Sequence, residues 1–234
     1  PDTKGGVKFN PDGTLDRGAM LAIMNPDDKA GLEAALKLKD EFGAEVTVLT
    51  MGLPKAADAL REALAMGADK AILVTDRVLG GADTWATSTT IAGALRNLDY
   101  DLIITGRQAI DGDTAQVGPQ IAEHLDLPQV TYVEDLKYDG EKTFTIKKST
   151  EEGYQMVEVE APCVITVLAT ANKARYMSVR GIVEAYLKEV EIWNFSNVRV
   201  DEKKLGLNGS PTRVFKSFTK GVKAAGKIYE VEPE

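Results

Sequence analysis

Residues 25–127 alternate between short aliphatic runs and helical patterns, and this alternation constrains the fold more than any other feature of the sequence. The runs, at residues 46–50, 71–74 and 102–106, are continuously apolar or β-branched, as in strands buried on both faces. Helical patterns occupy about residues 26–43, 54–66, 83–97 and 114–125. Repeated strand–helix units of this spacing predict an open, mostly parallel α/β sheet with helices on both faces.

The first of these helices has a well-marked start. Asn25 reads as its N-cap, Pro26 as its first helical residue, and Asp27 and Asp28 as acids facing the positive end of the helix dipole. No strand precedes this helix, although an open α/β sheet of this kind normally begins with one. We therefore expect a strand just before Pro1.

The pattern changes after residue 128. Residues 131–133, 144–146 and 156–159 resemble antiparallel strands, with Asp139-Gly140 as a hairpin turn. Residues 163–167 form another apolar strand pattern, and a polar stretch with several helix breakers follows Glu189. Such a stretch rarely folds alone, so we expect an extended C-terminal arm that wraps a partner or the domain itself.

Composition excludes several classes of partner and site. Acidic residues outnumber basic ones 36 to 28, which disfavours nucleic acid and anionic lipid as partners. A single cysteine, Cys163, excludes an internal disulfide and fits a reducing cytoplasm. One histidine and one cysteine cannot build a His/Cys zinc cage, and no apolar run reaches the ~20 residues of a membrane span.

The loop after the third strand is the strongest candidate for a ligand site, because ligands of open parallel sheets bind outside the carboxyl ends of the strands. Free backbone amides and a helix N-terminus in this loop suit a phosphate. From the residues alone, a capped helix after a tight turn is an equally good interpretation. The loop residues concerned are Gly112, Asp113, Thr114, Ala115, Gln116, Val117 and Gly118.

A second loop, residues 76–84, follows the second strand. Two consecutive glycines precede an Asp83-Thr84 helix cap, and Arg77 offers a cation. This loop suits a flat ring or a second nucleotide, and a flexible turn with an ordinary cap is the alternative. Neither the dinucleotide fingerprint nor the P-loop pattern occurs in the chain.

The remaining reactive side chains point to no catalyst. We interpret His124 as a surface histidine near a helix end, Cys163 as a buried thiol, and Trp85 and Trp193 as packing or interface residues. No catalytic set of side chains and no metal-binding set is visible. A protein that holds a cofactor, and leaves the chemistry to it, fits this pattern.

Several of these motifs together resemble the electron transfer flavoprotein beta subunit. The resemblance lies in residues 25–28, 50–52, 63–69, 106–118 and 175–179, and extends over nearly the whole chain. It implies an adenine nucleotide α-hydrolase-like fold and pairing with an FAD-containing alpha subunit, with the family's first strand and closing helix outside this sequence. On this basis residues 1–188 form a nucleotide-binding α/β domain, and residues 189–234 an extension that contacts the partner subunit.

The resemblance also implies the cofactor. Ordinary members hold AMP, at positions that match residues 25–28, Met51 and residues 112–123 here. Bifurcating members hold FAD there, which oxidises NADH and sends one electron to ferredoxin or flavodoxin and the other, through the alpha-subunit FAD, to a dehydrogenase. Arg77, Asp83, Thr84 and Thr87 resemble the flavin loop of that branch. We therefore expect FAD, with a carrier holding structural AMP, or a non-redox nucleotide-binding module, as alternatives.

A last matching segment concerns the dehydrogenase. Arg175, Tyr176, Val179, Arg180 and Ile182 match the recognition loop that docks it, with Val179 as the apolar anchor. Many members carry several lysines after this loop, whereas residues 182–186 carry none here, and such a change of charge alters partner choice. An acyl-CoA dehydrogenase is the expected partner, and a lactate dehydrogenase-type flavoprotein is the alternative.

Overall fold

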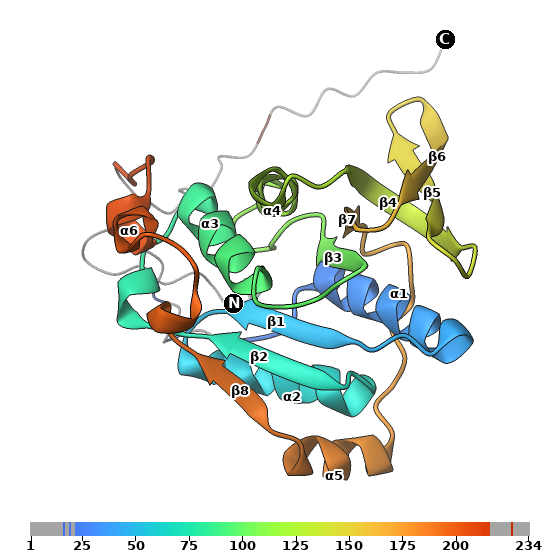
Figure 1. The fold of residues 1–234 in the computed structure, drawn as a ribbon, viewed down its shortest axis with the longest axis horizontal. Helices are drawn as coiled ribbons and strands as arrows, with labels where there is room; N and C mark the ends of the chain where they lie inside the picture. The colour runs from blue at the N-terminus through green and yellow to red at the C-terminus, as the bar shows by residue number, and fades with distance from the viewer. Residues whose placement is uncertain (1–15, 17–18, 20–21, 216–225, 227–234) are drawn as a thin grey trace.

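The computed structural model describes residues 16, 19, 22–215 and 226 (Figure 1). Its helices are α1 (Pro26–Phe42), α2 (Ala57–Met66), α3 (Thr84–Leu95), α4 (Val117–Leu125), α5 (Val179–Leu187) and α6 (Gly206–Gly209), with short 3-10 helices η2 (Pro54–Ala56), η3 (Arg77–Leu79), η4 (Phe195–Asn197) and η5 (Glu202–Lys204). The strands are β1 (Thr47–Met51), β2 (Lys70–Val74), β3 (Leu102–Gly106), β4 (Gln129–Tyr138), β5 (Thr143–Thr150), β6 (Gly153–Glu160), β7 (Cys163–Val167) and β8 (Val190–Trp193).

The strands form two open sheets. One has the order β1-β2-β8 and is entirely parallel. The other has the order β3-β7-β4-β5-β6, in which β7 pairs in parallel with both β3 and β4, and β5 pairs antiparallel with β4 and β6. The predicted open α/β architecture, with antiparallel strands added after the parallel ones, is confirmed.

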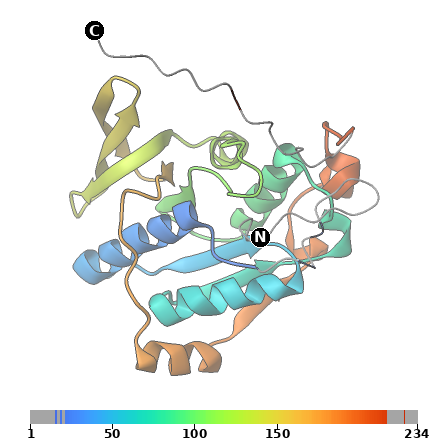
Figure 2. The same cartoon turned by 180° about the vertical axis from the view of Figure 1, so that it is seen from behind.

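Strand β2 illustrates how both faces of a sheet are covered. Successive side chains of a strand point to opposite faces. Ala71 and Leu73 pack in a core cluster with residues of α1 and α2, whereas Ile72 and Val74 pack in another that includes the end of α3 and the C-terminal arm. Figure 2 shows α1 and α2 in front of the sheet, on the face that points away from the viewer in Figure 1. The continuous apolar run of this strand is explained by burial on both sides.

Strand β7 lies between β3 and β4, and all five of its residues are buried. Cys163 is completely buried at its start, and burial raises the pKa of the thiol to about 11. The interpretation of Cys163 as a buried structural thiol is therefore confirmed.

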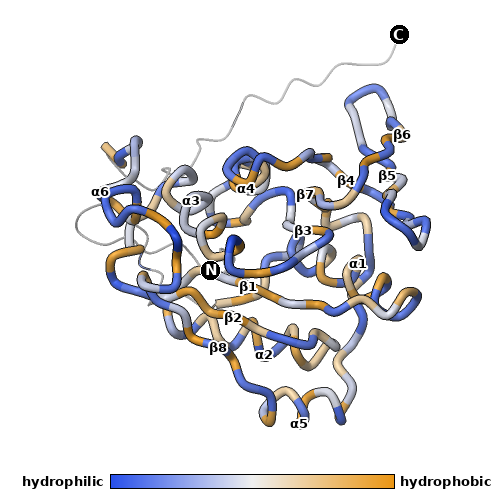
Figure 3. The backbone as a smooth tube through the Cα atoms, viewed as in Figure 1, coloured by the Kyte–Doolittle hydropathy of each residue, from blue (hydrophilic) through white to orange (hydrophobic). Residues whose placement is uncertain are grey.

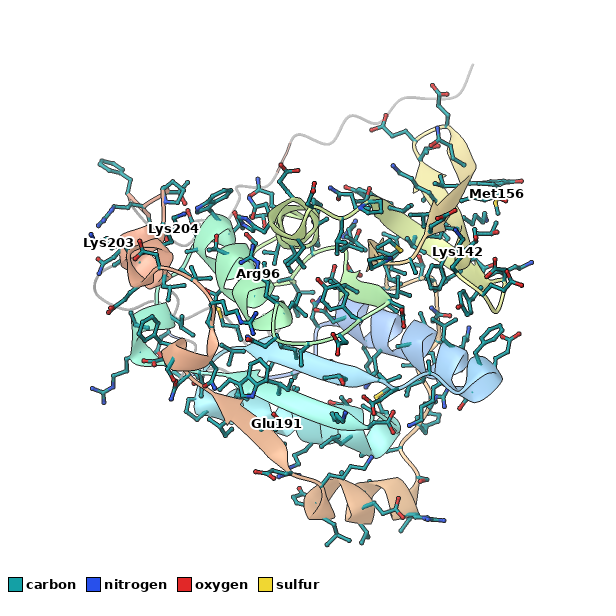
Figure 4. The ribbon with its side chains drawn as sticks, viewed as in Figure 1. Arg96, Lys142, Met156, Glu191, Lys203 and Lys204 are labelled. Carbon is teal, nitrogen blue, oxygen red and sulfur yellow. The ribbon has the colours of Figure 1, made fainter. Side chains whose placement is uncertain are left out.

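The antiparallel strands extend away from the rest of the molecule (Figure 1). Asp139 fixes the first hairpin, because its Oδ1 accepts hydrogen bonds from the amides of Glu141, Lys142 and Thr143. Figure 3 shows that the hairpin tips are hydrophilic, whereas the middle of β2 is hydrophobic. Met156 on the edge strand β6 is 58% exposed and projects outward (Figure 4).

The sequence prediction placed one helix start wrongly. We predicted that the fourth helix begins near Thr114, but α4 begins at Val117 and its N-cap is Gln116. The reason lies in the backbone, since Asp113 and Ala115 both have φ of 52°, in the left-handed region. An α-helix cannot include such residues, so the loop continues for three residues more.

Strand β8 was not predicted at all. It has only four residues, pairs in parallel with β2, and carries Glu191 among its apolar residues (Figure 4). The arm that follows packs back onto the domain, where Val198 and Leu205 are buried in one cluster with Ile72. The strand expected before Pro1 and the helix expected beyond Glu234 lie outside the described residues.

Candidate functional site

The loop between β3 and α4 is hydrogen-bonded to the start of α1. Asn25 occupies the N-cap position of α1, but its side chain does not cap that helix. Its amide donates to the Gln108 carbonyl at 2.8 Å, and its Oδ1 accepts from the Ile110 amide at 3.1 Å. The polar group that we expected to satisfy a helix end therefore ties the loop to α1 instead.

Asp27 and Asp28 likewise accept hydrogen bonds from backbone amides far along the chain. Asp28 Oδ1 accepts from the Gly106 amide at 2.6 Å, and Asp27 Oδ1 accepts from the Ala169 amide at 2.9 Å. Burial raises the pKa of Asp28 above its usual value, although the hydrogen bonds from Gly106 and Asn25 act in the opposite direction. These carboxylates bring together the carboxyl ends of β3 and β7, the edge at which an open sheet binds ligands.

Only glycine fits at the end of β3. A Cβ at Gly106 would lie 2.6 Å from the backbone nitrogen of Asp28, which is too close for any side chain. Pro26 has the predicted place in the first turn of α1, and its missing N–H leaves no donor unpaired there. The contact between the β3–α4 loop and α1 thus depends on residue types that the sequence shows directly.

Beyond this contact the loop is folded tightly and leaves its last amides free. The Ala109 carbonyl accepts from the amides of Gly112 and Asp113, and the Gln108 side chain donates to Asp113 Oδ1 at 2.9 Å. Within the part of the chain that the structure describes, the amides of residues 114–118 have no hydrogen-bond acceptor. A short row of unpaired N–H groups therefore leads into the first turn of α4.

Helix α3 begins next to α4, so the two predicted loops meet. Thr84 Oγ1 donates to Gln116 Oε1 at 2.8 Å, and one turn further Ser88 Oγ lies 3.1 Å from Gln120 Oε1. Figures 1 and 2 both show the two helices side by side. The positive ends of both helix dipoles thus lie at one edge of the molecule.

His124 was interpreted as a surface histidine near a helix end, but it is partly buried and has hydrogen-bonding partners. Its Nε2 lies 3.2 Å from the hydroxyls of Ser88 and Thr89, and its ring meets Trp85 edge-on at 4.6 Å between centroids. Partial burial is the main reason that the pKa of His124 lies below its usual value. This contact joins α3 to α4 and gives both residues a packing role.

The glycine loop, residues 76–84, packs against the C-terminal arm. A Cβ on Gly81, whose φ is 73°, would lie 3.1 Å from Leu207, and the Leu207 amide donates to the Gly80 carbonyl. Asp83 Oδ1 caps α3 through the Ala86 amide, while its Oδ2 accepts both the amide and the hydroxyl of Thr212. Gly81 therefore serves the close approach of the arm.

The other predicted cofactor residues are spread more widely. Thr87 is the fourth residue of α3 and is partly buried. Met51 ends β1, and its side chain packs on the cluster around Ile72. Arg77 is exposed on η3, and no hydrogen bond or ion pair joins it to the described residues of the β3–α4 loop. The structure unites residues 25–28, Thr84 and residues 106–118, and leaves Arg77 apart from them.

One polar group at this edge was missed in the sequence. Thr105 Oγ1 is buried without a hydrogen-bond partner among the described residues, near the end of β3. It lies beneath α4, because a Cβ on Gly118 would come within 2.7 Å of it. A buried donor without an acceptor is uncommon in proteins. The only sequence signal was a threonine at the end of an aliphatic strand.

Arg107 and Tyr132 were also missed. The Arg107 guanidinium lies 5.9 Å from the centre of the Tyr132 ring, and its Nε is 3.5 Å from Asp27 Oδ2. Tyr132 sits at an irregularity in the β4–β7 pairing with φ of 58°, which is an outlier for a bulky residue. No local pattern in the sequence marks such a bulge.

In the segment expected to dock a dehydrogenase, Arg175 binds within the chain. Its guanidinium makes two bonds of 3.0 Å with the buried Glu33 carboxylate and one of 2.8 Å with Asp40. The Glu33 carboxylate beside it raises the pKa of Arg175 further, with Asp40 adding to the effect. Arg175 thereby fixes the segment before α5 to α1, and its contact with a partner stays a prediction.

Apolar side chains on and beside α5 are exposed to solvent. Tyr176 is 93% exposed and Val179 82%, whereas Ala185 is the helix's one buried residue. Arg180 pairs with Glu184 on the helix surface. We call the exposed apolar residues of this region the α5 face: Tyr176, Met177, Val179, Ile182, Val183, Tyr186 and Leu187.

Comparison with known proteins identifies the family. The model of the electron transfer flavoprotein domain matches residues 12–198. The chain is 55% identical to the electron transfer flavoprotein subunit beta of Clostridium acetobutylicum, over 98% of this chain and 88% of that protein. The chain belongs to the electron transfer flavoprotein beta subunit family.

Two further members of this family carry names that refer to acyl-CoA reductases. The chain is 50% identical to the caffeyl-CoA reductase-Etf complex subunit CarD of Acetobacterium woodii, over 97% of this chain and 87% of that protein. It is 51% identical to the acryloyl-CoA reductase electron transfer subunit gamma of Anaerotignum propionicum, over 98% and 89%. Within the described residues, no helix is long and apolar enough to cross a membrane.

Proposed function

We propose that this chain is the small subunit of a heterodimeric electron transfer flavoprotein and holds an adenine nucleotide where α3 and α4 begin. The row of unpaired amides at residues 114–118 is the observation that carries this proposal. Backbone N–H groups at a helix N-terminus are a common way to bind a phosphate. Membership of the beta subunit family supports the same site and implies the alpha subunit as the other half.

The residues present fit a phosphate-bearing nucleotide. The buried Thr105 hydroxyl has no hydrogen-bond partner among the described residues. A Cβ added to Gly112 would meet no atom within 4 Å, so a ligand can approach the backbone there. Asp111 and Asp113 lie in the same loop, and their charges oppose a purely electrostatic attraction of an anion. The amides of residues 114–118 would therefore do most of the binding.

We further propose that the nucleotide is FAD, with NADH as its electron source and with ferredoxin or flavodoxin and the alpha-subunit FAD as acceptors. The bond from Thr84 to Gln116 supports this choice, because it joins the loop that resembles a flavin loop to the proposed phosphate site. When bound, FAD would supply hydride acceptance and single-electron transfer. The chain itself would bind the phosphates through residues 114–118 and orient the two loops through Thr84 and Gln116.

A specific observation favours AMP as the second candidate. The opening that two glycines were expected to leave for a flavin ring is filled by the arm, since Gly81 packs on Leu207. Arg77 is exposed and apart from the phosphate site. With AMP the chain would be an ordinary carrier subunit in which flavin resides only in the alpha subunit.

We propose that the α5 face docks the dehydrogenase that receives the electrons. Contiguous exposed apolar side chains commonly mark protein–protein contact sites. The relatives named after caffeyl-CoA and acryloyl-CoA reductases support a flavoprotein of the acyl-CoA dehydrogenase class, and a lactate dehydrogenase-type flavoprotein is the other candidate.

The number of flavins in the purified alpha–beta heterodimer tests the cofactor. Two FAD per heterodimer, both released and quantified after denaturation, are the expected result. One FAD with one AMP would contradict the bifurcating function and indicate an ordinary carrier. A beta chain that purifies alone, without nucleotide, would overturn the electron-transfer proposal as a whole.

A further inference from the structure

Helix α5 is too short to hold its own shape. It has nine residues, and isolated helices of this length are marginal in water. It also buries almost nothing, since Ala185 is its one buried residue. The geometry of the α5 face must therefore be set by contacts with the rest of the molecule.

The first of these contacts is a close approach to α2. A Cβ on Gly181 would lie 2.4 Å from the carbonyl oxygen of Ala65, so the two backbones meet where only glycine fits. Ser178 caps the start of α5 by accepting the Gly181 amide at 2.9 Å. These contacts fix the N-terminal half of the helix against α2.

The C-terminal half is held by an arginine from α2. Arg61 Nη1 donates to the Ala185 carbonyl at 2.5 Å and also to the Lys188 carbonyl. The last carbonyls of a helix have no partner within the helix and carry a partial negative charge. Because α5 has no basic residue in its last turn, Arg61 supplies both the donors and the positive charge.

Arg61 reaches the α5 face itself as well. Its guanidinium lies 5.9 Å from the ring centre of Tyr186, which is 74% exposed. Arg61 is in turn carried by a firmly packed helix, because Leu60, Ala63 and Leu64 of α2 are buried in the core. The arginine thus connects a rigid helix to the end of a weakly packed one.

We propose that Arg61 is a positioning residue for electron delivery, which fixes the angle at which the α5 face meets the partner dehydrogenase. The inference rests on the proposed docking function of that face. Binding is tighter when the contacting groups are already held in their bound arrangement. Loss of Arg61 would remove none of the exposed apolar side chains. It would, however, release the end of the helix that carries them.

The test uses the complete alpha–beta heterodimer with bound cofactors and a purified acyl-CoA dehydrogenase as the probe. In the Arg61→Gln variant the KM for the dehydrogenase should rise about tenfold, or about 1.4 kcal/mol, with kcat unchanged. Arg61→Lys should recover part of the loss, because the ammonium keeps one donor near the carbonyls. Hydrogen exchange should accelerate in residues 179–188 and not in residues 57–66.

Arg96→Gln is the matched control. Arg96 Nη2 donates to the His124 carbonyl at 2.7 Å, so it caps the end of α4 as Arg61 caps the end of α5, away from the α5 face. The Arg96 variant should leave the KM for the dehydrogenase unchanged. Equal rises in both variants would indicate general destabilisation and overturn the proposal.

Val179→Ser separates the inference from the function on which it rests. Val179 is 82% exposed, so its replacement leaves the fold intact and removes apolar area from the α5 face. A higher KM with Val179→Ser and an unchanged KM with Arg61→Gln would overturn the role of Arg61 and keep the docking function. An unchanged KM in both variants would overturn both.

Discussion

At the scale of single residues, Asn25, Asp27 and Asp28 have a role that their spacing alone does not reveal. The spacing predicts a helix start, and α1 does begin at Pro26. Their side chains, however, bind backbone groups of Gly106, Ile110 and Ala169, which follow far later in the chain. Contacts of this kind depend on the tertiary fold and leave no local pattern, so the sequence could not predict them.

Two glycines of the β3–α4 loop should respond differently to substitution. Gly112 has open space around it and a φ outside the left-handed region, so Gly112→Val should keep the free energy of unfolding within about 0.5 kcal/mol. The same change should reduce nucleotide retention, because the side chain would obstruct a phosphate. The nucleotide that remains after gel filtration, quantified by chromatography, is the measurement; unchanged retention would contradict the site.

Gly118→Ala should instead affect stability. Its Cβ would lie 2.7 Å from both Thr105 Oγ1 and Thr166 Cγ2, so α4 must shift away from the sheet. Overpacking of this kind costs about 1–3 kcal/mol. Urea unfolding followed by circular dichroism checks this, and a variant as stable as the unmodified protein would show that the contact relaxes freely.

Arg175 should contribute more to stability than any exposed arginine. Arg175→Met would leave the Glu33 carboxylate, only 7% exposed, without its main partner. Removing one partner of a largely buried ion pair costs about 3 kcal/mol or more. Arg180→Met is the control, since the Arg180 side chain is 86% exposed and its pair with Glu184 should be worth less than about 1 kcal/mol. Similar losses in the two variants, measured by urea unfolding, would refute this distinction.

At the scale of elements, the sequence predicted the strands and helices that are buried on one or both faces. Strands β2, β3 and β7 are recognisable because their apolar runs are continuous. Strand β8 is a short edge strand with two exposed residues, and therefore has no comparable run. The start of α4 was predicted too early because Asp113 and Ala115 have left-handed φ angles. Neither residue is a glycine, the residue type that would have indicated such a conformation in the sequence.

The C-terminal arm and the glycine loop should separate when Asp83 is changed. Asp83→Ala removes the cap of α3, worth about 1 kcal/mol, together with both bonds to Thr212. Hydrogen exchange in residues 205–212 should then accelerate, while exchange in β7 stays unchanged. Unaltered exchange in the arm would show that the packing of Leu205 and Leu207 alone retains it.

Acid should release the same contact. Burial raises the pKa of Asp83, but the hydrogen bonds from Ala86 and Thr212 outweigh it, so the pKa lies below its usual value of 3.8. A carboxylate with a lowered pKa stabilises the folded state above that usual value and loses this contribution as the pH falls below it. Exchange in residues 205–212 should therefore be constant from pH 7 to 5 and, after correction for intrinsic rates, increase below about 3.8.

At the scale of the whole molecule, stability should decrease from the parallel strands toward the antiparallel ones. All residues of β7 are buried, whereas β6 is an edge strand with Tyr154 and Met156 exposed. Regions with few buried apolar contacts open at lower free energy. Native-state hydrogen exchange should show the slowest amides in β7 and fast ones in β6, and equal protection would mean that the molecule opens only as a unit.

The contact between the arm and the glycine loop also determines when this protein can mature during its synthesis. The Asp83 amide and the Ser210 hydroxyl that it binds are 127 positions apart in the chain. At roughly 5–20 residues per second, a ribosome needs about 6–25 s to cover that distance. Residues 76–84 therefore cannot complete their contact with the arm until the arm has been synthesised, so this part of the fold is closed only at a late stage of translation.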